Sequence, residues 1–201
     1  MSDSEQAEDE RDPTKLRPTA GGMDRSIVMV GLMGAGKSSI GRRLATRLAL
    51  PFVDADTEIE AAAGCTVAEF FERHGEAEFR DGERRVIARL LEDEPKVLAT
   101  GGGAFMDEET RAAIAHAGIS VWLRADLDTL VRRTARRSDR PLLNKGDPSG
   151  TLENLMETRH PVYAQADIVV ESDDGPPDET VERVVDALAA FRDRIEALPA
   201  Q

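Results

Sequence analysis

Short apolar runs alternate along the chain with longer segments in which apolar residues recur every three or four positions. The runs have the length of strands, and the longer segments have the period of helices. Strands that alternate with helices are typical of a parallel sheet covered by helices on both faces. The pattern therefore predicts the α/β class, with strands at residues 27–30, 52–53, 97–99, 119–123 and 168–170.

The segments between the predicted strands differ in character. Two of them look like insertions rather than parts of the core. One is residues 57–92, which is mostly helical with interruptions at Gly64 and Gly75, and the other is the polar stretch 137–150, which has the composition of a mobile lid. The remaining helices are expected from Lys37 onward and over residues 107–117, 126–136, 151–165 and 178–198.

Composition narrows the class of protein. At 201 residues, with 40% apolar and 32% charged residues, the chain suits one folded domain. No apolar stretch approaches the roughly 20 residues that span a bilayer, and the acidic start lacks a secretory signal. A single cysteine, Cys65, fits a reducing compartment. We therefore expect a cytoplasmic protein without a membrane partner.

Charge excludes another class of function. The formal net charge of −13 opposes nucleic-acid binding, which needs a basic surface. Part of the acidity lies in residues 1–24, which are polar and contain no aromatic residue. We interpret this segment as a disordered acidic tail, and residues 25–201 as a single domain.

The most informative motif follows the first predicted strand. Residues 31–38 read Gly-Leu-Met-Gly-Ala-Gly-Lys-Ser, between an apolar strand and a helix that starts at Lys37. Backbone N–H groups of such a loop, together with the helix N-terminus, bind polyphosphate. Lys37 is then expected to reach the β and γ phosphates, and the Ser38 hydroxyl to bind Mg²⁺. An accidental glycine-rich turn would not explain the Lys-Ser pair.

Two carboxylates follow the second predicted strand, in Asp54-Ala55-Asp56. Alternation along an extended strand would place both on one side, beyond the carboxyl end where α/β sheets bind ligands. One carboxylate could then hold Mg²⁺ through water, and the other could accept a proton from an acceptor hydroxyl. The alternative is that Asp56 caps the next helix, which is compatible with catalysis.

Three further groups could contact a ligand. Arg80 and Glu83 share a helical face, as a surface ion pair or as a guanidinium positioned to bind a carboxylate. Gly101, Gly102 and Gly103 follow the third strand and allow a ligand to approach the backbone. An arginine cluster that includes Arg133 and Arg140 could stabilise a transferring phosphoryl group, although some of its members are expected to be solvated surface charges.

Taken together, these motifs resemble the shikimate kinase family, within the nucleoside-monophosphate-kinase-like group of P-loop NTPases. The resemblance covers residues 27–163, and it is weaker towards the C-terminus. The loop is generic, whereas the other motifs are specific in this order and spacing. They read Asp-Ala-Asp, Phe-Arg-Asp-Gly-Glu, Gly-Gly-Gly, Arg-Pro-Leu-Leu and Arg-His-Pro-Val-Tyr.

The resemblance implies ATP-dependent phosphorylation of the shikimate 3-hydroxyl with Mg²⁺. By position, Asp56 would be base or orienting group, Lys37 and Arg140 would act on the phosphates, and Arg80 and Arg159 would bind the shikimate carboxylate. Gly102, with Gly101 and Gly103, would contact the ring hydroxyls of the substrate through backbone amides. ATP would be bound by Gly34, Ala35, Gly36, Lys37, Ser38, Ser39, Arg133 and Arg140, and the metal by Ser38 and Asp54.

The resemblance also implies an architecture. A three-layer αβα fold would contain a parallel sheet of strand order 2-3-1-4-5, a substrate-binding segment at about 57–83 and a lid at about 135–150. The enzyme is expected to act as a monomer. Two alternatives stay open, namely a kinase of another small alcohol such as gluconate, and a catalytically silent nucleotide-binding module. The acidic stretch at 171–177, where some relatives have a basic residue near adenine, departs from the family pattern.

Overall fold

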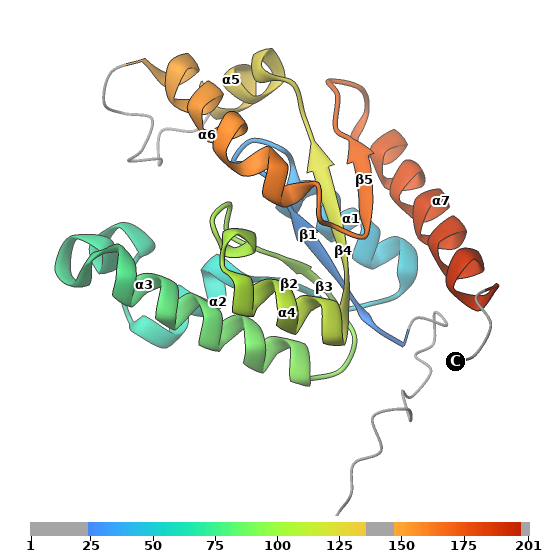
Figure 1. The fold of residues 1–201 in the computed structure, drawn as a ribbon, viewed down its shortest axis with the longest axis horizontal. Coiled ribbons are helices and arrows are strands. Elements are labelled where there is room, and N and C mark those ends of the chain that lie inside the picture. Colours follow the sequence, from blue (N-terminus) through green and yellow to red (C-terminus); the bar gives the residue numbers. More distant parts are fainter. Residues whose placement is uncertain (1–23, 136–146, 198–201) are drawn as a thin grey trace, which may run out of the picture.

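The computed structural model describes residues 24–135 and 147–197 and contains a five-stranded parallel sheet (Figure 1). The strand order β2-β3-β1-β4-β5 confirms the order that the family resemblance implies. Residues 1–23 of the predicted tail and 136–146 of the predicted lid lie outside the described residues. The strands are β1 (Ser26–Val30), β2 (Phe52–Asp54), β3 (Val97–Ala99), β4 (Gly118–Arg124) and β5 (Ile168–Glu171).

Burial along the strands explains why the sequence shows apolar runs rather than alternation. All five residues of the central strand β1 are buried, because helices cover both of its faces. The edge strand β5 instead alternates buried and exposed residues, and Val169 is 44% exposed. The position of a strand in the sheet therefore decides its hydrophobic pattern.

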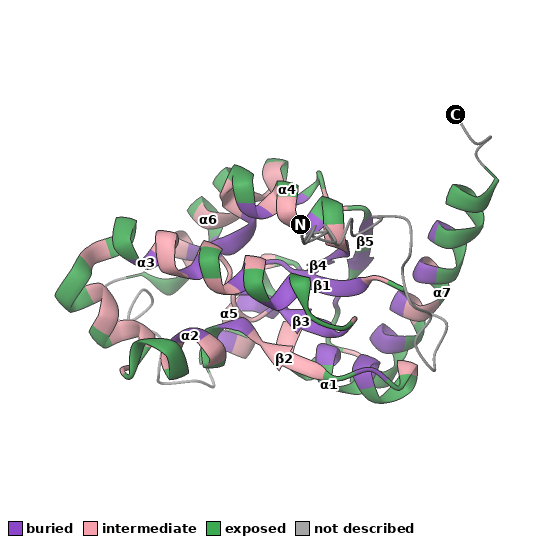
Figure 2. Ribbon diagram, turned by 90° about the horizontal axis from the view of Figure 1, so that it is seen from below, coloured by how far each residue is buried: buried purple, intermediate pink, exposed green. Residues whose placement is uncertain are grey.

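Helices form a layer on each side of the sheet. Figure 2 shows α1 on one side of the strands and α4 on the other, with the buried residues concentrated between them. α1 contacts α7, and α3 contacts both α2 and α4. The helices are α1 (Lys37–Leu48), α2 (Ala55–Ala63), α3 (Val67–Glu92), α4 (Glu108–Ala117), α5 (Leu127–Ala135), α6 (Pro148–Tyr163) and α7 (Pro177–Glu196), with the 3₁₀ turn η1 at Ala104–Met106.

The helical segment predicted at residues 57–92 is interrupted at Gly64 and Gly75, as the sequence indicated. α2 ends at Gly64, which adopts φ 68°, and α3 begins with a capping box between Thr66 and Glu69. Gly75 then interrupts α3 with φ 82° and ψ 176°. The part of α3 after Gly75 carries Arg80 and Glu83 and is followed by β3.

Register aligns the ends of the three strands that precede the candidate site. Met29 of β1 pairs with Ala99 of β3, and Asp54 of β2 pairs with the same residue. Because the strands are parallel, the segments that follow them leave the sheet at one edge. The glycine loop, the acidic pair and the three-glycine turn are therefore brought together by strand pairing.

Among residues 24–135 and 147–197, no helix combines the length and the apolar content needed to cross a membrane.

Few residues of α6 are buried, so the packing of this helix should depend strongly on each of them. Leu152 is completely buried and Leu155, on the same helix, is only partly buried. Leu152→Ala should lower the free energy of unfolding by about 2–5 kcal/mol, because it removes packed methyl groups and leaves a cavity. Urea denaturation measures this change. Leu155→Ala should cost less than half as much, and equal costs would contradict the assignment of Leu152 as the anchor.

Candidate active site

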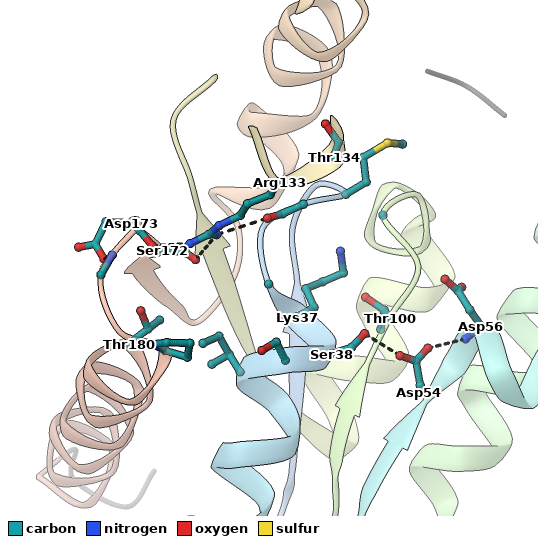
Figure 3. Close-up of a pocket in the computed structure, with 18 residues that line it drawn as sticks. Lys37, Ser38, Asp54, Asp56, Thr100, Arg133, Thr134, Ser172, Asp173 and Thr180 are labelled. Atoms are coloured by element: carbon teal, nitrogen blue, oxygen red, sulfur yellow. Dashed lines mark hydrogen bonds between the residues drawn. The ribbon is translucent and has the colours of Figure 1, made fainter. Parts of the chain in front are cut away.

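A cleft of about 390 Å³ lies at the carboxyl ends of the strands (Figure 3). Segments that follow β1, β2, β3 and β5 line it, together with two residues of α5. Its walls include the following predicted site residues: Gly34, Gly36, Lys37, Ser38, Ser39, Asp54, Asp56, Gly102 and Arg133.

The glycine loop lines this cleft and leads directly into the N-terminus of α1. Gly36 is the N-cap of α1 with φ 98°, a left-handed conformation that favours glycine, and its carbonyl accepts the N–H of Ile40 at 2.8 Å. The first N–H groups of α1 therefore face the cleft without helical partners. Lys37 Nζ donates to the carbonyls of Gly31 and Leu32 at 2.8 and 3.0 Å, which holds its charge over the loop. Positive charge and N–H donors together favour phosphate.

Ser38 and Asp54 form the part of the site that fits a metal ion. The Ser38 hydroxyl donates to Asp54 Oδ2 at 2.7 Å, so two oxygen ligands from α1 and β2 are already adjacent. No group of three or more His, Cys, Asp or Glu suited to a metal occurs in the described part of the chain. Two protein oxygens fit Mg²⁺ that arrives with a nucleotide, because Mg²⁺ keeps phosphate oxygens and waters as its other ligands.

The position of Asp56 corrects one expectation. β2 ends at Asp54 and α2 begins at Ala55, so the prediction that both carboxylates lie on one side of an extended strand was wrong. Asp54, not Asp56, is the N-cap, because its Oδ1 accepts the Asp56 N–H at 3.2 Å and turns the chain into a helix. Both residues nevertheless line the same cleft.

Arg80 and Glu83 form a largely buried ion pair rather than a solvated surface pair. Arg80 Nη1 donates to Glu83 Oε2 at 2.6 Å, and Glu83 is only 2% exposed. Burial raises the pKa of Glu83 although Arg80 opposes this change. Burial alone would lower the pKa of Arg80, but Glu83 and Glu76 outweigh it and raise the pKa. The guanidinium is therefore held in one place with its charge intact.

The three-glycine turn lies directly against this pair. A Cβ at Gly101 would lie 2.7 Å from Glu83 Oε1 and 2.8 Å from Asp56 Oδ1. A Cβ at Gly103 would lie 2.5 Å from Arg80 Nη1. Only glycine allows backbone and charged groups to approach so closely. Glu83 Oε1 is buried and has no hydrogen-bond partner among the described residues, so it is available to a donor that enters here.

Two side chains of α6 hold the three-glycine turn through hydrogen bonds. Arg159 Nη1 donates to the Gly102 carbonyl oxygen at 2.9 Å, and the Tyr163 hydroxyl donates to the same oxygen. Arg80 and Arg159 therefore contact one glycine turn from two different helices. The family pattern contains Tyr163, but nothing in the sequence distinguishes its hydroxyl from any other buried phenol.

The other end of the cleft is closed by Arg133 and the turn after β5. Arg133 Nη1 donates to the Gly34 carbonyl at 3.3 Å and to the Ser172 hydroxyl at 3.0 Å, and Nη2 donates to the Asp173 carbonyl. Asp173 also receives two hydrogen bonds from Arg183, at 2.8 and 3.1 Å. The sequence did not indicate Ser172 or Arg183, because their contacts join segments far apart in the chain.

Arg140, Ala35 and Ser39 are the remaining predicted site residues. Arg140 lies outside the described residues. Ala35 is buried within the loop, and its N–H donates to the Leu32 carbonyl at 3.2 Å. Ser39 lines the cleft, and its hydroxyl accepts a hydrogen bond from Arg43 at 2.9 Å.

Fold and loop together define a P-loop phosphotransferase of the nucleoside-monophosphate-kinase-like type. Comparison with known proteins gives the family. The family model described as shikimate kinase matches residues 33–189. A shikimate kinase of Bradyrhizobium diazoefficiens is 63% identical over 166 residues, which are 83% of this chain and 80% of that protein. The chain belongs to the shikimate kinase family.

Solved structures agree with this assignment. Shikimate kinase from Acinetobacter baumannii in complex with shikimate has a TM-score of 0.79 and 35% identity, over 83% of this chain and 93% of that one. A gluconokinase from Sinorhizobium meliloti has a TM-score of 0.60 and 20% identity, over 86% of this chain and 95% of that one. The second likeness shows the shared fold alone.

The Asp173 ion pair gives a prediction about pH. Hydrogen bonds from Arg183 and from the Gly175 N–H lower the pKa of Asp173 to about 2. A depressed folded pKa means that the stabilisation is present above the unfolded value of about 3.9 and is lost as pH falls through the folded value. Because the pair is exposed, Asp173→Asn should lower the free energy of unfolding at pH 7 by less than about 1 kcal/mol.

Urea denaturation at several pH values tests this, with Asp186→Asn on the same helix as Arg183 as the control. The deficit of Asp173→Asn should shrink between about pH 5 and pH 2. A deficit that grows on acidification would contradict the proposed role of the ion pair.

Proposed function

We propose that this protein transfers the γ-phosphoryl group of ATP to the 3-hydroxyl of shikimate, giving shikimate 3-phosphate and ADP. The observation that carries the proposal is the meeting of Arg80, Arg159 and Asp56 around the three-glycine turn, beside a phosphate-binding loop. Two arginines suit an anionic acceptor, and a nearby carboxylate suits a hydroxyl. Membership of the family supports the same acceptor.

The donor half of the reaction is assigned to the loop and α1. The N–H groups of residues 34 and 36–39 would bind the phosphates, and Lys37 would move its ammonium from the loop carbonyls to the β and γ oxygens. Mg²⁺, bound by Ser38 and Asp54, would neutralise phosphate charge when present. Arg133 would lie at the nucleoside end, where it already contacts the turn after β5.

The acceptor half is assigned to α2, α3, α6 and the glycine turn. Arg80, fixed by Glu83, and Arg159 would bind the carboxylate as two forks. Asp56 would hold the 3-hydroxyl and take its proton, or orient it for attack on the γ phosphorus. Gly101, Gly102 and Gly103 would provide backbone contacts. Binding of the acceptor at both its carboxylate and its 3-hydroxyl would fix the distance between that hydroxyl and the γ phosphorus. Such positioning supplies much of the rate acceleration in phosphoryl transfer.

Two segments would cover the bound substrates. Residues 57–83 would form the substrate-binding segment of the single domain 25–201, and residues 135–150 would form a lid that brings Arg140 to the phosphates and excludes water. We propose a cytoplasmic monomer that needs Mg²⁺. The single Cys65, which forms no disulfide, supports a reducing compartment.

Shikimate-dependent ADP release with Mg-ATP tests the proposed function, since a kinase releases ADP only when its acceptor is present. We expect release with shikimate, little release without it and little with gluconate. Asp56→Asn should remove most of the shikimate-dependent release, whereas Asp193→Asn on α7 should not. Equal release with and without shikimate would reject the kinase assignment, and preference for gluconate would select the other small-alcohol kinase. No release, despite nucleotide binding, would select the silent module.

The carboxylate-binding role of Arg80 can be tested without leaving Glu83 unpaired. Arg80→Lys keeps a positive charge beside Glu83 but loses the bidentate fork. It should raise the shikimate KM by about tenfold, with kcat changed less than threefold, because most of the lost contact is made equally in ground and transition states. Steady-state kinetics at saturating ATP measure both parameters.

Arg85→Lys is the matched control on the same helix, since Arg85 is 73% exposed and pairs only weakly with Asp81, at 3.4 Å. It should leave both parameters unchanged. If both variants had the same shikimate KM, a role for Arg80 in binding the shikimate carboxylate would be ruled out.

A further inference from the structure

Tyr163 is the single tyrosine of the chain, and the proposed reaction gives it no task. It is the last residue of α6 and is completely buried. Its ring lies 5.8 Å from that of Trp122 and 6.4 Å from that of Phe105, measured between centroids. A buried phenol needs a hydrogen bond to offset the loss of water, and this one donates to the Gly102 carbonyl.

That carbonyl receives two donors from one helix. Arg159 and Tyr163 are four residues apart, on the same face of α6, and both donate to the Gly102 oxygen. A carbonyl oxygen accepts two hydrogen bonds, so α6 satisfies it completely. Arg159 would give up its share when its guanidinium turns to the substrate carboxylate, whereas the Tyr163 bond can stay.

Peptide geometry links this carbonyl to the acceptor site. The peptide between Gly102 and Gly103 is trans, so its C=O and N–H point in opposite directions. With the carbonyl held by α6, the Gly103 N–H points away from α6. Arg80 of α3 lies against Gly103, since its Nη1 would be 2.5 Å from a Cβ at that position. Neither the Gly102 nor the Gly103 N–H donates to another described residue, so both are available to a ligand.

We propose that Tyr163 is a positioning residue that holds the Gly102–Gly103 peptide in the orientation needed to bind the acceptor. The inference rests on the proposed function and names the group that maintains the glycine turn while Arg159 binds the substrate. Loss of the hydroxyl lets the peptide rotate, which weakens acceptor binding and leaves the donor half untouched. A purely structural hydroxyl would affect stability but not one substrate in particular.

Tyr163→Phe in the full chain tests the proposal, because it removes the hydroxyl and keeps the ring in the core. We expect the shikimate KM to rise about five- to tenfold, as for one lost hydrogen bond, with kcat within twofold. The ATP KM should not change. A shikimate KM within error of wild type, or an equal rise in both KM values, would overturn the proposal.

Ser120→Ala is the matched control for the loss of a buried hydroxyl. The Ser120 hydroxyl donates to Asp167 at 2.6 Å, between β4 and the start of β5, away from the glycine turn. Both variants should lower Tm by a few degrees, but only Tyr163→Phe should raise the shikimate KM. If Ser120→Ala raised it equally, the effect would reflect general stability and the proposal would fail.

Fluorinated tyrosine gives a second test that does not depend on the folding of Tyr163→Phe. Because the chain has one tyrosine, global replacement by 3,5-difluorotyrosine modifies this site alone. Ring fluorine lowers the phenol pKa, and the resulting anion cannot donate to Gly102. The shikimate KM of the fluorinated protein should therefore rise with pH as the phenol ionises, which near-ultraviolet absorbance follows directly.

The wild-type protein should show a flat shikimate KM over the same alkaline interval. Burial raises the pKa of Tyr163, so its hydroxyl stays a donor there. The charged and titratable groups around it are Arg159 and His160 of α6 and Arg80 and Glu83 of α3. Burial lowers the pKa of His160, so this residue is already neutral in that interval.

Parallel pH profiles for the fluorinated and wild-type proteins would overturn the proposal while shikimate phosphorylation stands. Absence of phosphorylation by the wild-type enzyme would overturn both.

Discussion

Parallel pairing of β1, β2 and β3 is the constraint on which the rest of this structure depends. Met29 and Asp54 both pair with Ala99, so the glycine loop, the acidic pair and the glycine turn leave the sheet at the same level. No direct contact between these segments is needed to bring them together. A shift of either pairing by one residue would move Asp54 away from Ser38 and turn buried side chains to the wrong face.

Each cationic side chain named for the site is already held by hydrogen-bond acceptors of the protein itself. The protein is strongly acidic, with a net charge of −13, yet the site presents Lys37, Arg80, Arg133 and Arg159. Two loop carbonyls hold Lys37, and the buried Glu83 carboxylate holds Arg80. The turn after β5 holds Arg133, and the Gly102 carbonyl holds Arg159. Side chains that are already ordered lose less entropy on binding, so more of each contact contributes to affinity.

The sequence predicted the fold, and it named many of the residues that line the cleft, because its signals are local. Apolar runs located all five strands, and Gly64 and Gly75 marked the interruptions of the helical insertion. Local reasoning failed at Asp56, because the Asp54 carboxylate starts α2 one residue after β2. Strand alternation no longer applies once a helix has begun. Strand order came from the family resemblance, since periodicity carries no information about which strands are neighbours.

Contacts between distant segments were beyond the reach of the sequence. Tyr163 meets Gly102 across 61 positions and Arg133 meets Ser172 across 39, and neither pairing leaves a pattern in either segment. Burial of Glu83 was equally hidden, because a helical Arg-Glu pair looks the same whether it lies on a surface or under a glycine turn. These contacts hold the parts of the site together, whereas the local motifs decide its chemistry.

We propose that one site joins a phosphate-binding loop to an acceptor bound by its carboxylate, so that phosphate moves to a single hydroxyl. Phosphorus-31 and proton NMR of the product made from Mg-ATP and shikimate tests this most directly. We predict one phosphate monoester, with its phosphorus coupled to the proton on carbon 3 of the ring. Inorganic phosphate alone, or a monoester at another hydroxyl, would contradict the arrangement of Asp56, Arg80 and Arg159 described above.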